Sequence, residues 1–353
     1  MLPLLVLFLA MTAGAAAQNP APPPASQPVA PPAAQPGAAS DRVPVPEPTA
    51  QAQAYHRSGN VLWVLNTLWA LVLPAALLWT GLSARMRDWA QAAGRKWFFA
   101  VALYWVIFAI LTTAVDLPRV YYESFMREHA YGLSNQTLGK WASDQAAGLG
   151  VTLVIGALVL WVPYLLLARS PRRWWLYTGA LAVPFIVLIV LVQPIWIDPL
   201  FNRFGPMKDA SLEAEIVLLL YAVHRLSTTL IDRFGARFGF SSLADVASLP
   251  LVLMLFSGVS LVTDPVALAV QRYFEHEADR FALEVTRDNH AGAMAFAIMQ
   301  QENLVVPRPG RLYTWFRMNH PPVGERIDFF NDYRPWESGQ PLVYGHLFRK
   351  AGL

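Results

Sequence analysis

The sequence contains no cysteine and few charged residues. The absence of cysteine excludes disulfides, thiolate zinc ligands and cysteine nucleophiles. Only 14% of the 353 residues are charged, and 55% are hydrophobic. A soluble domain usually carries about 25% charged residues, so this chain has too little charge to cover the surface of a soluble protein. Its apolar content is too high for a chain that is mostly disordered. We therefore expect an integral membrane protein in contact with membrane lipids.

The charge pattern also argues against a nucleic-acid partner. The formal net charge is only +3, from 27 Lys and Arg against 24 Asp and Glu. The arginines are scattered among apolar runs, whereas a nucleic-acid-binding surface gathers them into a basic patch or stripe. We therefore expect no nucleic acid among the partners.

Two segments precede the first long apolar run. Residues 1–17 hold a short apolar stretch followed by small residues that end in Ala15-Ala16-Ala17, which is typical of a secretory signal peptide. Residues 18–57 are rich in Pro and Ala. Such a composition buries too little apolar surface to fold, and it predicts an extended, disordered tether.

Uncharged runs predict the membrane spans. A helix needs about 20 apolar residues to cross the hydrocarbon core. Four uncharged runs are long enough: 58–84, 97–115, 145–168 and 174–197. They define a four-span membrane region over residues 58–197, with a polar loop at 119–145. Two further, weaker spans are expected in the region 217–270, and the apolar runs that predict them are 216–231 and 246–263.

The polar loop and the basic residues give the remaining organisation of this region. In the loop, Gly132 is expected to end one helix, and Ser134 or Asn135 to cap the next. Basic residues gather after the first and third spans, and the positive-inside rule places both of these loops in the cytoplasm. The N-terminal tether then lies outside, as a signal peptide requires. The expected location is a bacterial inner (plasma) membrane.

Two polar segments near the C-terminus hold residues that could do chemistry. Glu275 and Asp279 have i, i+4 spacing, which places both on one face of a helix. A carboxylate such as Glu275 can bind zinc, but a solvated helix beside the membrane explains the same spacing more simply. His320 precedes two prolines and is held in an extended backbone. Arg326, six residues further on, could simply belong to the start of a helix.

Five segments in one order change this interpretation. They are REHAYGLSNQTLGKWASDQ (127–145), PIWIDPLFNRFGPMKD (194–209), DVASLPL (245–251), RYFEHEADRFAL (272–283) and NHPPVGERI (319–327). Together they resemble the type I CAAX prenyl proteases, the a-factor-converting enzyme family of integral-membrane zinc metalloendopeptidases. The likeness extends from about residue 58 to 336. It implies an all-α barrel of membrane helices around a water-filled chamber, with residues 271–353 as the C-terminal part of the metallopeptidase domain.

The resemblance also assigns roles to the candidate residues. It implies that Glu275 is a zinc ligand and that Asp279 orients a zinc-bound histidine. His320 and Arg326 would contact the carbonyl of a peptide or protein substrate, which can carry a C-terminal lipid. The other two zinc ligands of the family come from an HExxH helix, whose Glu is the general base. A zinc-bound water would then attack the peptide bond.

The HExxH motif is absent from this sequence. No two histidines are spaced i, i+4, and Arg280 stands where a second histidine would follow His276-Glu277. In the family, the HExxH helix and a small soluble subdomain fall between the segments matched here by LEAEI (212–216) and LLLYAVHRL (218–226). Here these two segments abut. Residues 198–216 therefore resemble the truncated start of the soluble catalytic subdomain.

Three interpretations follow from this departure. A catalytic zinc needs three protein ligands, so we expect a chain with only Glu275 and His320 to bind zinc poorly and to lack peptidase activity. The first interpretation is a zinc metalloendopeptidase of the CAAX type whose sequence is incomplete. The second is a pseudoenzyme that binds peptides or lipidated tails. The third is an unrelated small-molecule transporter, which only the pair His224-Arg225 inside a predicted span favours.

Overall fold

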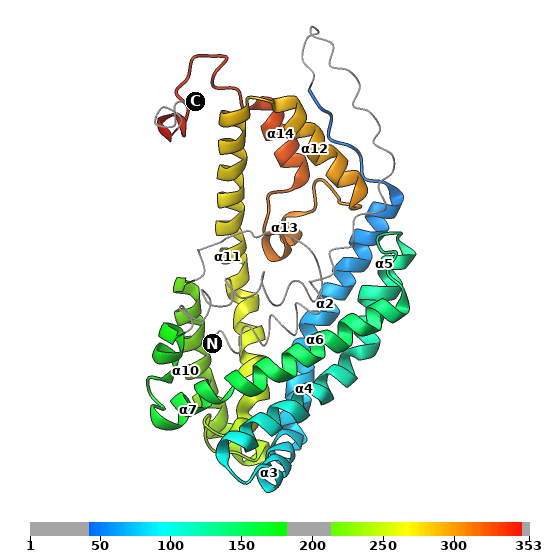
Figure 1. The fold of residues 1–353 in the computed structure, drawn as a ribbon. Coiled ribbons are helices and arrows are strands. Elements are labelled where there is room, and N and C mark those ends of the chain that lie inside the picture. Colours follow the sequence, from blue (N-terminus) through cyan, green and yellow to red (C-terminus); the bar gives the residue numbers. More distant parts are fainter. Residues whose placement is uncertain (1–41, 182–212, 348–353) are drawn as a thin grey trace. The chain divides into compact units, whose positions relative to one another are not determined.

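The computed structural model describes residues 42–181 and 213–347, and the regular structure of these residues is entirely helical (Figure 1). This confirms the all-α fold. The elements are α2 (Ala50–Trp79), α3 (Leu82–Gly94), α4 (Trp97–Tyr121), the π-helix η1 (Tyr122–Met126), α5 (Arg127–Ala130), α6 (Leu138–Val159), α7 (Trp161–Arg169), α10 (Glu213–Phe238), the 3₁₀-helix η3 (Val246–Ser248), α11 (Leu249–Thr286), α12 (Asn289–Glu302), α13 (Arg311–Arg317) and α14 (Val323–Asp332).

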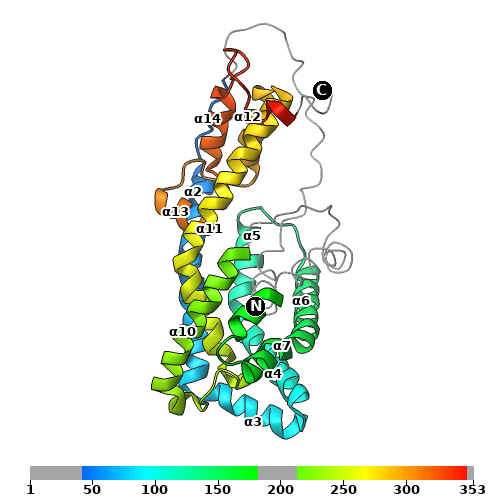
Figure 2. The same cartoon turned by 90° about the vertical axis from the view of Figure 1, so that its left-hand side faces the viewer.

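The chain divides into two compact units. Among the described residues, the first unit contains Leu65–Ser260, and the second combines residues 42–64 with the residues from Leu261 onward. The boundaries fall inside α2 and α11, and both helices run through them without a break (Figure 2). The candidate residues Glu275, Asp279, His320 and Arg326 all belong to the second unit.

Four helical stretches are long and apolar enough to cross a membrane: Ala50–Trp79, Trp97–Ala130, Leu138–Arg169 and Val246–Thr286. They contain most or all of the spans predicted at 58–84, 97–115, 145–168 and 246–263. The chain is therefore an integral membrane protein, as its composition predicts.

The other two predicted spans have different outcomes. Most of the span at 174–197 lies outside the described residues, and only residues 174–181 are described, as helix. The weaker span at 216–231 lies within α10, which is not among the candidate spans of the described residues. Within 216–231 the only Asp, Glu, Lys or Arg is Arg225, and Asp232 and Arg233 follow directly after it.

The segment before the first span is more ordered than the composition predicts. A disordered tether was expected to continue to residue 57, but α2 already begins at Ala50, and residues 42–48 pack on the second unit in an extended conformation. The Thr49 hydroxyl accepts a hydrogen bond from the backbone N–H of Ala52 (3.0 Å) at the start of α2. The structure therefore differs from the tether prediction over residues 42–57: tertiary contacts hold the Pro-containing residues 42–48, and residues 50–57, which contain no proline, belong to α2. Residues 1–17, the predicted signal peptide, lie outside the described residues.

The polar loop at 119–145 is mostly helical. It contains the end of α4, the π-helix η1 and α5, and it continues into α6. Gly132 follows α5 with a φ of +72°, a left-handed conformation that glycine adopts without strain. This agrees with the predicted helix stop. The next N-cap is Thr137, whose side chain accepts from the backbone N–H of Lys140 (3.3 Å), rather than Ser134 or Asn135.

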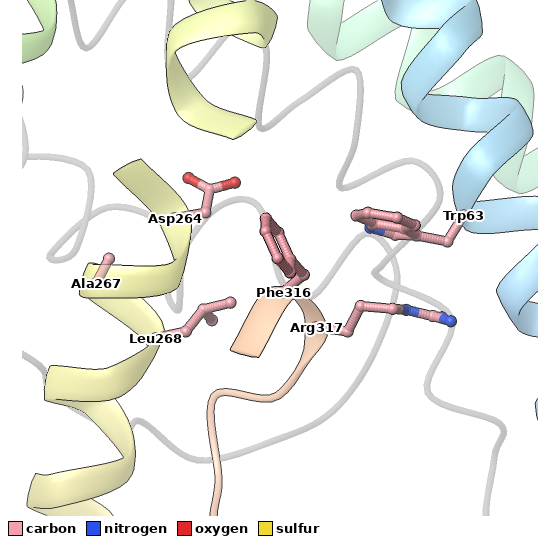
Figure 3. A pocket seen from close by; sticks show the side chains of 6 residues that line it. All are labelled: Trp63, Asp264, Ala267, Leu268, Phe316 and Arg317. Carbon is pink, nitrogen blue, oxygen red and sulfur yellow. The ribbon is translucent and has the colours of Figure 1, made fainter. Parts of the chain in front are cut away.

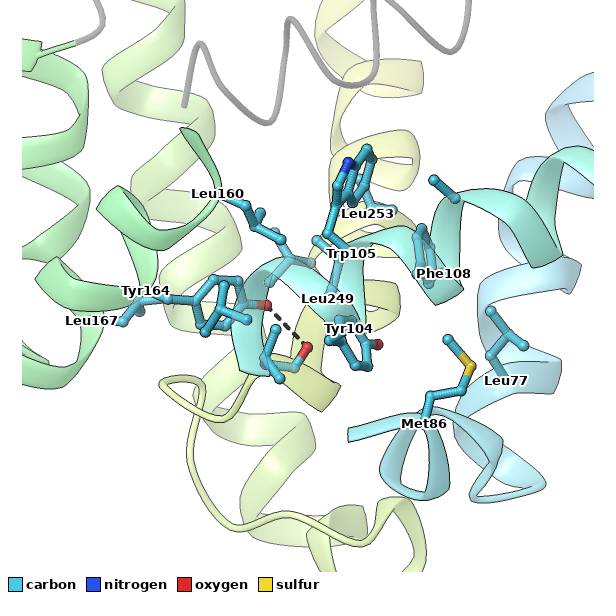
Figure 4. Close-up of a cluster of buried hydrophobic side chains, with 14 of the residues drawn as sticks. Leu77, Met86, Tyr104, Trp105, Phe108, Leu160, Tyr164, Leu167, Leu249 and Leu253 are labelled. Atoms are coloured by element: carbon cyan, nitrogen blue, oxygen red, sulfur yellow. Dashed lines mark hydrogen bonds between the residues drawn. The ribbon is translucent and has the colours of Figure 1, made fainter. Parts of the chain in front are cut away.

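The DVASLPL segment anchors the start of α11 in the core of the first unit. Asp245 accepts from the N–H of Ala247 (2.9 Å) and forms an ion pair with Arg87. The buried Tyr164 hydroxyl donates to the carbonyl of Val246 (3.3 Å), among the apolar side chains of α3, α4, α7 and α11 (Figure 4). The motif is therefore explained by capping and core packing.

A glycine on α6 allows a tryptophan of α4 to pack closely against it. The Nε1 of the buried Trp105 donates to the carbonyl of Thr152 (3.0 Å). A Cβ at Gly156 would lie 2.0 Å from that nitrogen, whereas a Cβ at Gly148 of the same helix would meet nothing within 4 Å.

We predict that Gly156→Ala destabilises the protein by about 1–3 kcal/mol, because overpacking forces the buried indole to move. The measurement is thermal unfolding of the purified protein in detergent. Gly148→Ala is the matched control, and it should be neutral or stabilising by up to about 1 kcal/mol. Equal melting temperatures for the two variants would show that the Trp105 contact does not limit stability.

Candidate functional site

Helix α11 carries Glu275 and Asp279 one turn apart, as their spacing predicts. The two carboxylates have different surroundings. Asp279 is only 5% exposed, whereas 36% of the Glu275 side chain is accessible. The same helix therefore presents one buried acid and one accessible acid.

The segment that carries His320 leads directly into α14. Pro322 is the N-cap of this helix, a position where its missing N–H and fixed φ cost little. The N–H of Gly324 donates to the carbonyl of Pro307 (2.9 Å), which attaches the first turn of α14 to the preceding loop. A Cβ at Gly324 would lie 2.9 Å from the same oxygen, so this close approach requires glycine. Arg326 then falls in the first turn of α14.

The structure brings all four candidate residues together. Arg326 binds Asp279 with two parallel hydrogen bonds, from Nε to Oδ2 (2.7 Å) and from Nη2 to Oδ1 (2.5 Å). The same Nη2 lies 3.7 Å from Oε2 of Glu275. The Nδ1 of His320 lies 3.0 Å from that Oε2. The chemical roles of these residues remain predictions, but their proximity is a property of the fold.

The cluster has a buried pair and an exposed pair. The side chains of Asp279 and Arg326 are 7% and 13% exposed, and their two-point geometry satisfies both charges. The His320 side chain is 48% exposed, and it contacts the accessible Glu275. A ligand would therefore meet His320 and Glu275 first.

Two further residues that the sequence did not single out support the cluster. The Arg326 guanidinium carbon lies 4.1 Å from the ring centroid of Phe296 on α12, a favourable cation–π arrangement. Arg272 on α11 donates to the carbonyls of Thr314 (2.9 Å) and Met318 (2.6 Å), at the end of α13. Arg272 therefore fixes the chain just before His320. The sequence signal that could have identified Arg272 was its position three residues before Glu275, one turn away on the same helix.

The His276-Glu277 pair does not join the cluster. The His276 ring packs against Phe329, with centroids 4.3 Å apart. Arg280, which occupies the position of the missing second histidine, donates to Glu277 (2.5 Å) and lies over the ring of Tyr333. The contacts with Phe329 and Tyr333 connect α11 to the end of α14, whereas the ion pair between Arg280 and Glu277 lies within α11.

The residues of the cluster do not fit a catalytic zinc ion. No group of three or more His, Asp or Glu side chains in the described ranges is arranged to hold a metal. Glu275 and His320 supply two ligands, and the other group beside the Glu275 carboxylate is the guanidinium of Arg326, which cannot coordinate a cation. A catalytic zinc requires three protein ligands and an open position.

Two other polar features lie away from the cluster. The Nδ1 of His224 accepts from Nε1 of the buried Trp174 (3.1 Å), so this histidine has a packing role in the first unit. In the second unit, an open pocket of about 300 Å³ is lined by Trp63, Asp264, Ala267, Leu268, Phe316 and Arg317 (Figure 3). Asp264 precedes Glu275 by eleven residues on α11, about 16 Å along a helix. The pocket shares no lining residue with the cluster.

Comparisons with known proteins identify the class of this chain. The model of the CAAX prenyl protease N-terminal region, described as five membrane helices, matches residues 34–203, and the model of peptidase family M48 matches residues 179–333. Together the two models match the chain from residue 34 to 333. The chain therefore belongs to peptidase family M48, as its five motifs predict.

Individual relatives agree with this assignment. The metalloprotease YhfN of Bacillus subtilis is 26% identical over 80% of this chain and 85% of its own length. CAAX prenyl protease 1 of Saccharomyces cerevisiae is 29% identical over 106 residues, which cover 30% of this chain and 23% of the yeast protein. The crystal structure of S. mikatae Ste24p matches 80% of this chain and 88% of its own, with a TM-score of 0.61 and 15% identity, which is a likeness of fold.

The alignment with YhfN is longer than this chain. It runs over 363 positions, but the 80% of this chain that it covers amounts to only about 282 residues of 353. About 81 aligned positions, the difference between 363 and 282, therefore have no residue of this chain opposite them.

We predict that Asp279→Ala destabilises the protein by about 3 kcal/mol, because it leaves the mostly buried Arg326 without its carboxylate. His320→Ala is the control, since an exposed side chain should change stability by no more than about 0.5 kcal/mol. Thermal unfolding in detergent compares the two variants. A melting temperature of Asp279→Ala equal to that of His320→Ala would rule out a structural role for the Asp279–Arg326 pair.

Proposed function

We propose that this protein is a membrane-embedded member of peptidase family M48 that binds peptide segments at Glu275 and His320 and, with this sequence, does not cleave them. One observation carries the proposal. An accessible Glu275–His320 pair is supported by a buried Asp279–Arg326 pair, in a chain that has no HExxH motif. The groups that would contact a substrate are present, but the glutamate of the HExxH motif, which is the family's general base, is missing.

The geometry indicates how an extended peptide would bind. The contact between Nδ1 of His320 and Glu275 fixes the imidazole ring, and in a neutral imidazole whose Nδ1–H donates to Glu275 the other nitrogen, Nε2, is a hydrogen-bond acceptor. A peptide N–H can bind this nitrogen or the accessible Glu275 carboxylate. The positive charge of Arg326, held in place by Asp279, lies beside them and attracts a peptide carbonyl oxygen or a terminal carboxylate. This set of groups supports binding, but it lacks the HExxH glutamate that is the family's general base, and it supplies no third metal ligand.

The ligands proposed are peptides or proteins, including those with a C-terminal lipid. Several relatives are named CAAX prenyl proteases, and the yeast enzyme is one of them. A lipidated tail suits a site at the polar end of a membrane helix, because the lipid can remain in or near the bilayer while the peptide reaches the polar residues.

An intact zinc endopeptidase is the second candidate, because the YhfN alignment indicates missing residues. The junction proposed at 216–217 lies inside α10, which passes through it as one helix. A segment inserted there in the gene would restore the family's zinc-binding helix. Resequencing the gene across codons 210–220 distinguishes a sequence error from a true deletion.

We predict that protein with this verified sequence purifies with far less than one zinc per chain, because only two ligands are available to the metal. Elemental analysis of the detergent-purified protein measures this. Adding 1,10-phenanthroline should leave the melting temperature unchanged, since no structural zinc is removed. YhfN prepared in the same way is the control for zinc loss during purification. Close to one zinc per chain, with chelator-sensitive peptide hydrolysis, would contradict the proposal.

We also predict that the cluster can be crosslinked to peptides. Because the chain has no cysteine, Asn319→Cys places a single benzophenone-maleimide label next to His320. Biotinylated peptides with and without a C-terminal prenyl group are added and irradiated. Replacing both Glu275 and His320 by Ala in the labelled protein should reduce capture at least fivefold. Equal capture by the two proteins would contradict binding at this pair, and preferential capture of the prenylated peptide would identify the lipid as part of the ligand.

A further inference from the structure

The chain's own N-terminal segment lies on α12 and α14 of the second unit like a bound peptide. We call residues 42–46, Arg-Val-Pro-Val-Pro, the strap. Three prolines, at 44, 46 and 48, prevent helix formation and favour an extended backbone. The burial pattern of the strap is also that of a bound extended peptide. Val43 is 4% exposed, its neighbours Arg42 and Pro44 are exposed, and Val45 is partly buried.

A buried asparagine binds the backbone of the strap at two points. Oδ1 of Asn331 accepts from the N–H of Val43, and Nδ2 of Asn331 donates to the carbonyl of the same residue, both at 2.9 Å. One side-chain amide therefore satisfies both backbone groups of one residue, as a neighbouring strand does when a peptide is added to a sheet edge. Farther along, Nε2 of the buried Gln300 donates to the carbonyl of Pro46 (2.7 Å).

Side-chain contacts add selectivity to these backbone contacts. Val43 lies in an apolar cluster with residues of α11, α12 and α14: Leu283, Ala293, Ala297, Val323, Ile327 and Phe330. Arg42 forms an ion pair with Asp332 and lies 3.7 Å from Asp328, which also pairs with Arg308 (2.6 Å). The surface thus has an acidic position followed by an apolar pocket and two backbone-binding amides.

We propose that this surface of α12 and α14 is a peptide-binding groove, occupied in cis by the strap, that recognises an extended segment in which a basic residue precedes a β-branched residue and prolines. Its residues differ from those of the Glu275–His320 pair, so the groove is independent of the proposed function. Attachment in cis gives the strap an effective concentration that outcompetes free peptide. A matching segment binds in trans only when the strap is displaced or weakened.

The test uses the full-length protein in detergent with a weakened strap. In the double variant Arg42→Ala/Val43→Asp, the groove residues are unchanged. The probe is a fluorescein-labelled peptide with the sequence of residues 40–48, SDRVPVPEP, and fluorescence anisotropy measures its binding. We expect saturable binding to the double variant that is at least tenfold tighter than binding to the wild type. Adding Asn331→Leu should weaken this binding at least tenfold, because the two backbone hydrogen bonds are lost.

Two controls make the outcome decisive. A peptide with aspartate in place of the valine equivalent to Val43 should not compete for the groove. If the double variant aggregates, Arg42→Ala alone weakens the strap, and the same comparison is made.

Hydrogen exchange provides a measurement without peptide: the Val43 amide should be protected in the wild type and lose protection in Asn331→Leu. Binding that is equal for wild type and weakened strap, or that survives Asn331→Leu, would overturn the proposal.

Discussion

The ion pair between Arg326 and Asp279 is the contact on which the candidate site depends. It joins α14 to α11, two helices whose paired residues are 47 positions apart in the chain. Both charges are mostly buried, so each needs the other, and the planar guanidinium meets the carboxylate in a fixed orientation. This orientation places the first turn of α14 against α11. It thereby brings His320, which immediately precedes α14, to Glu275.

The surrounding contacts act on the same few residues. Arg272 holds the carbonyls at the end of α13, and the Gly324 N–H holds the loop before α14. Phe296 covers the guanidinium of Arg326 from α12. The strap adds Val43 to the apolar core beneath α14. The position of a half-exposed histidine is therefore set by contacts from five segments, so the cluster cannot be understood from α11 alone.

The sequence predicts the site residues better than it predicts their surroundings. Motif order was enough to select Glu275, Asp279, His320 and Arg326, and hydrophobic runs located the membrane helices in the described ranges. Both signals are local. The ordering of residues 42–57, the cap at Thr137 and the role of Phe296 were not predicted, because each depends on a partner or a geometry that sequence spacing does not reveal. Asn331 is the clearest example: it contacts Val43 from 288 residues away.

The Asp279–Arg326 pair is buried and the Glu275–His320 pair is accessible, and this difference bears on whether the site has a function. Retention of Asp279 and Arg326 needs no catalytic explanation, since removing either partner of a buried ion pair is strongly destabilising. Glu275 and His320 are accessible, and substitutions at exposed positions usually cost little stability. Stability alone therefore does not require this exposed pair. The pair supplies only two ligands for a catalytic zinc, and recognition of a polar group of a peptide is the use that we propose for it.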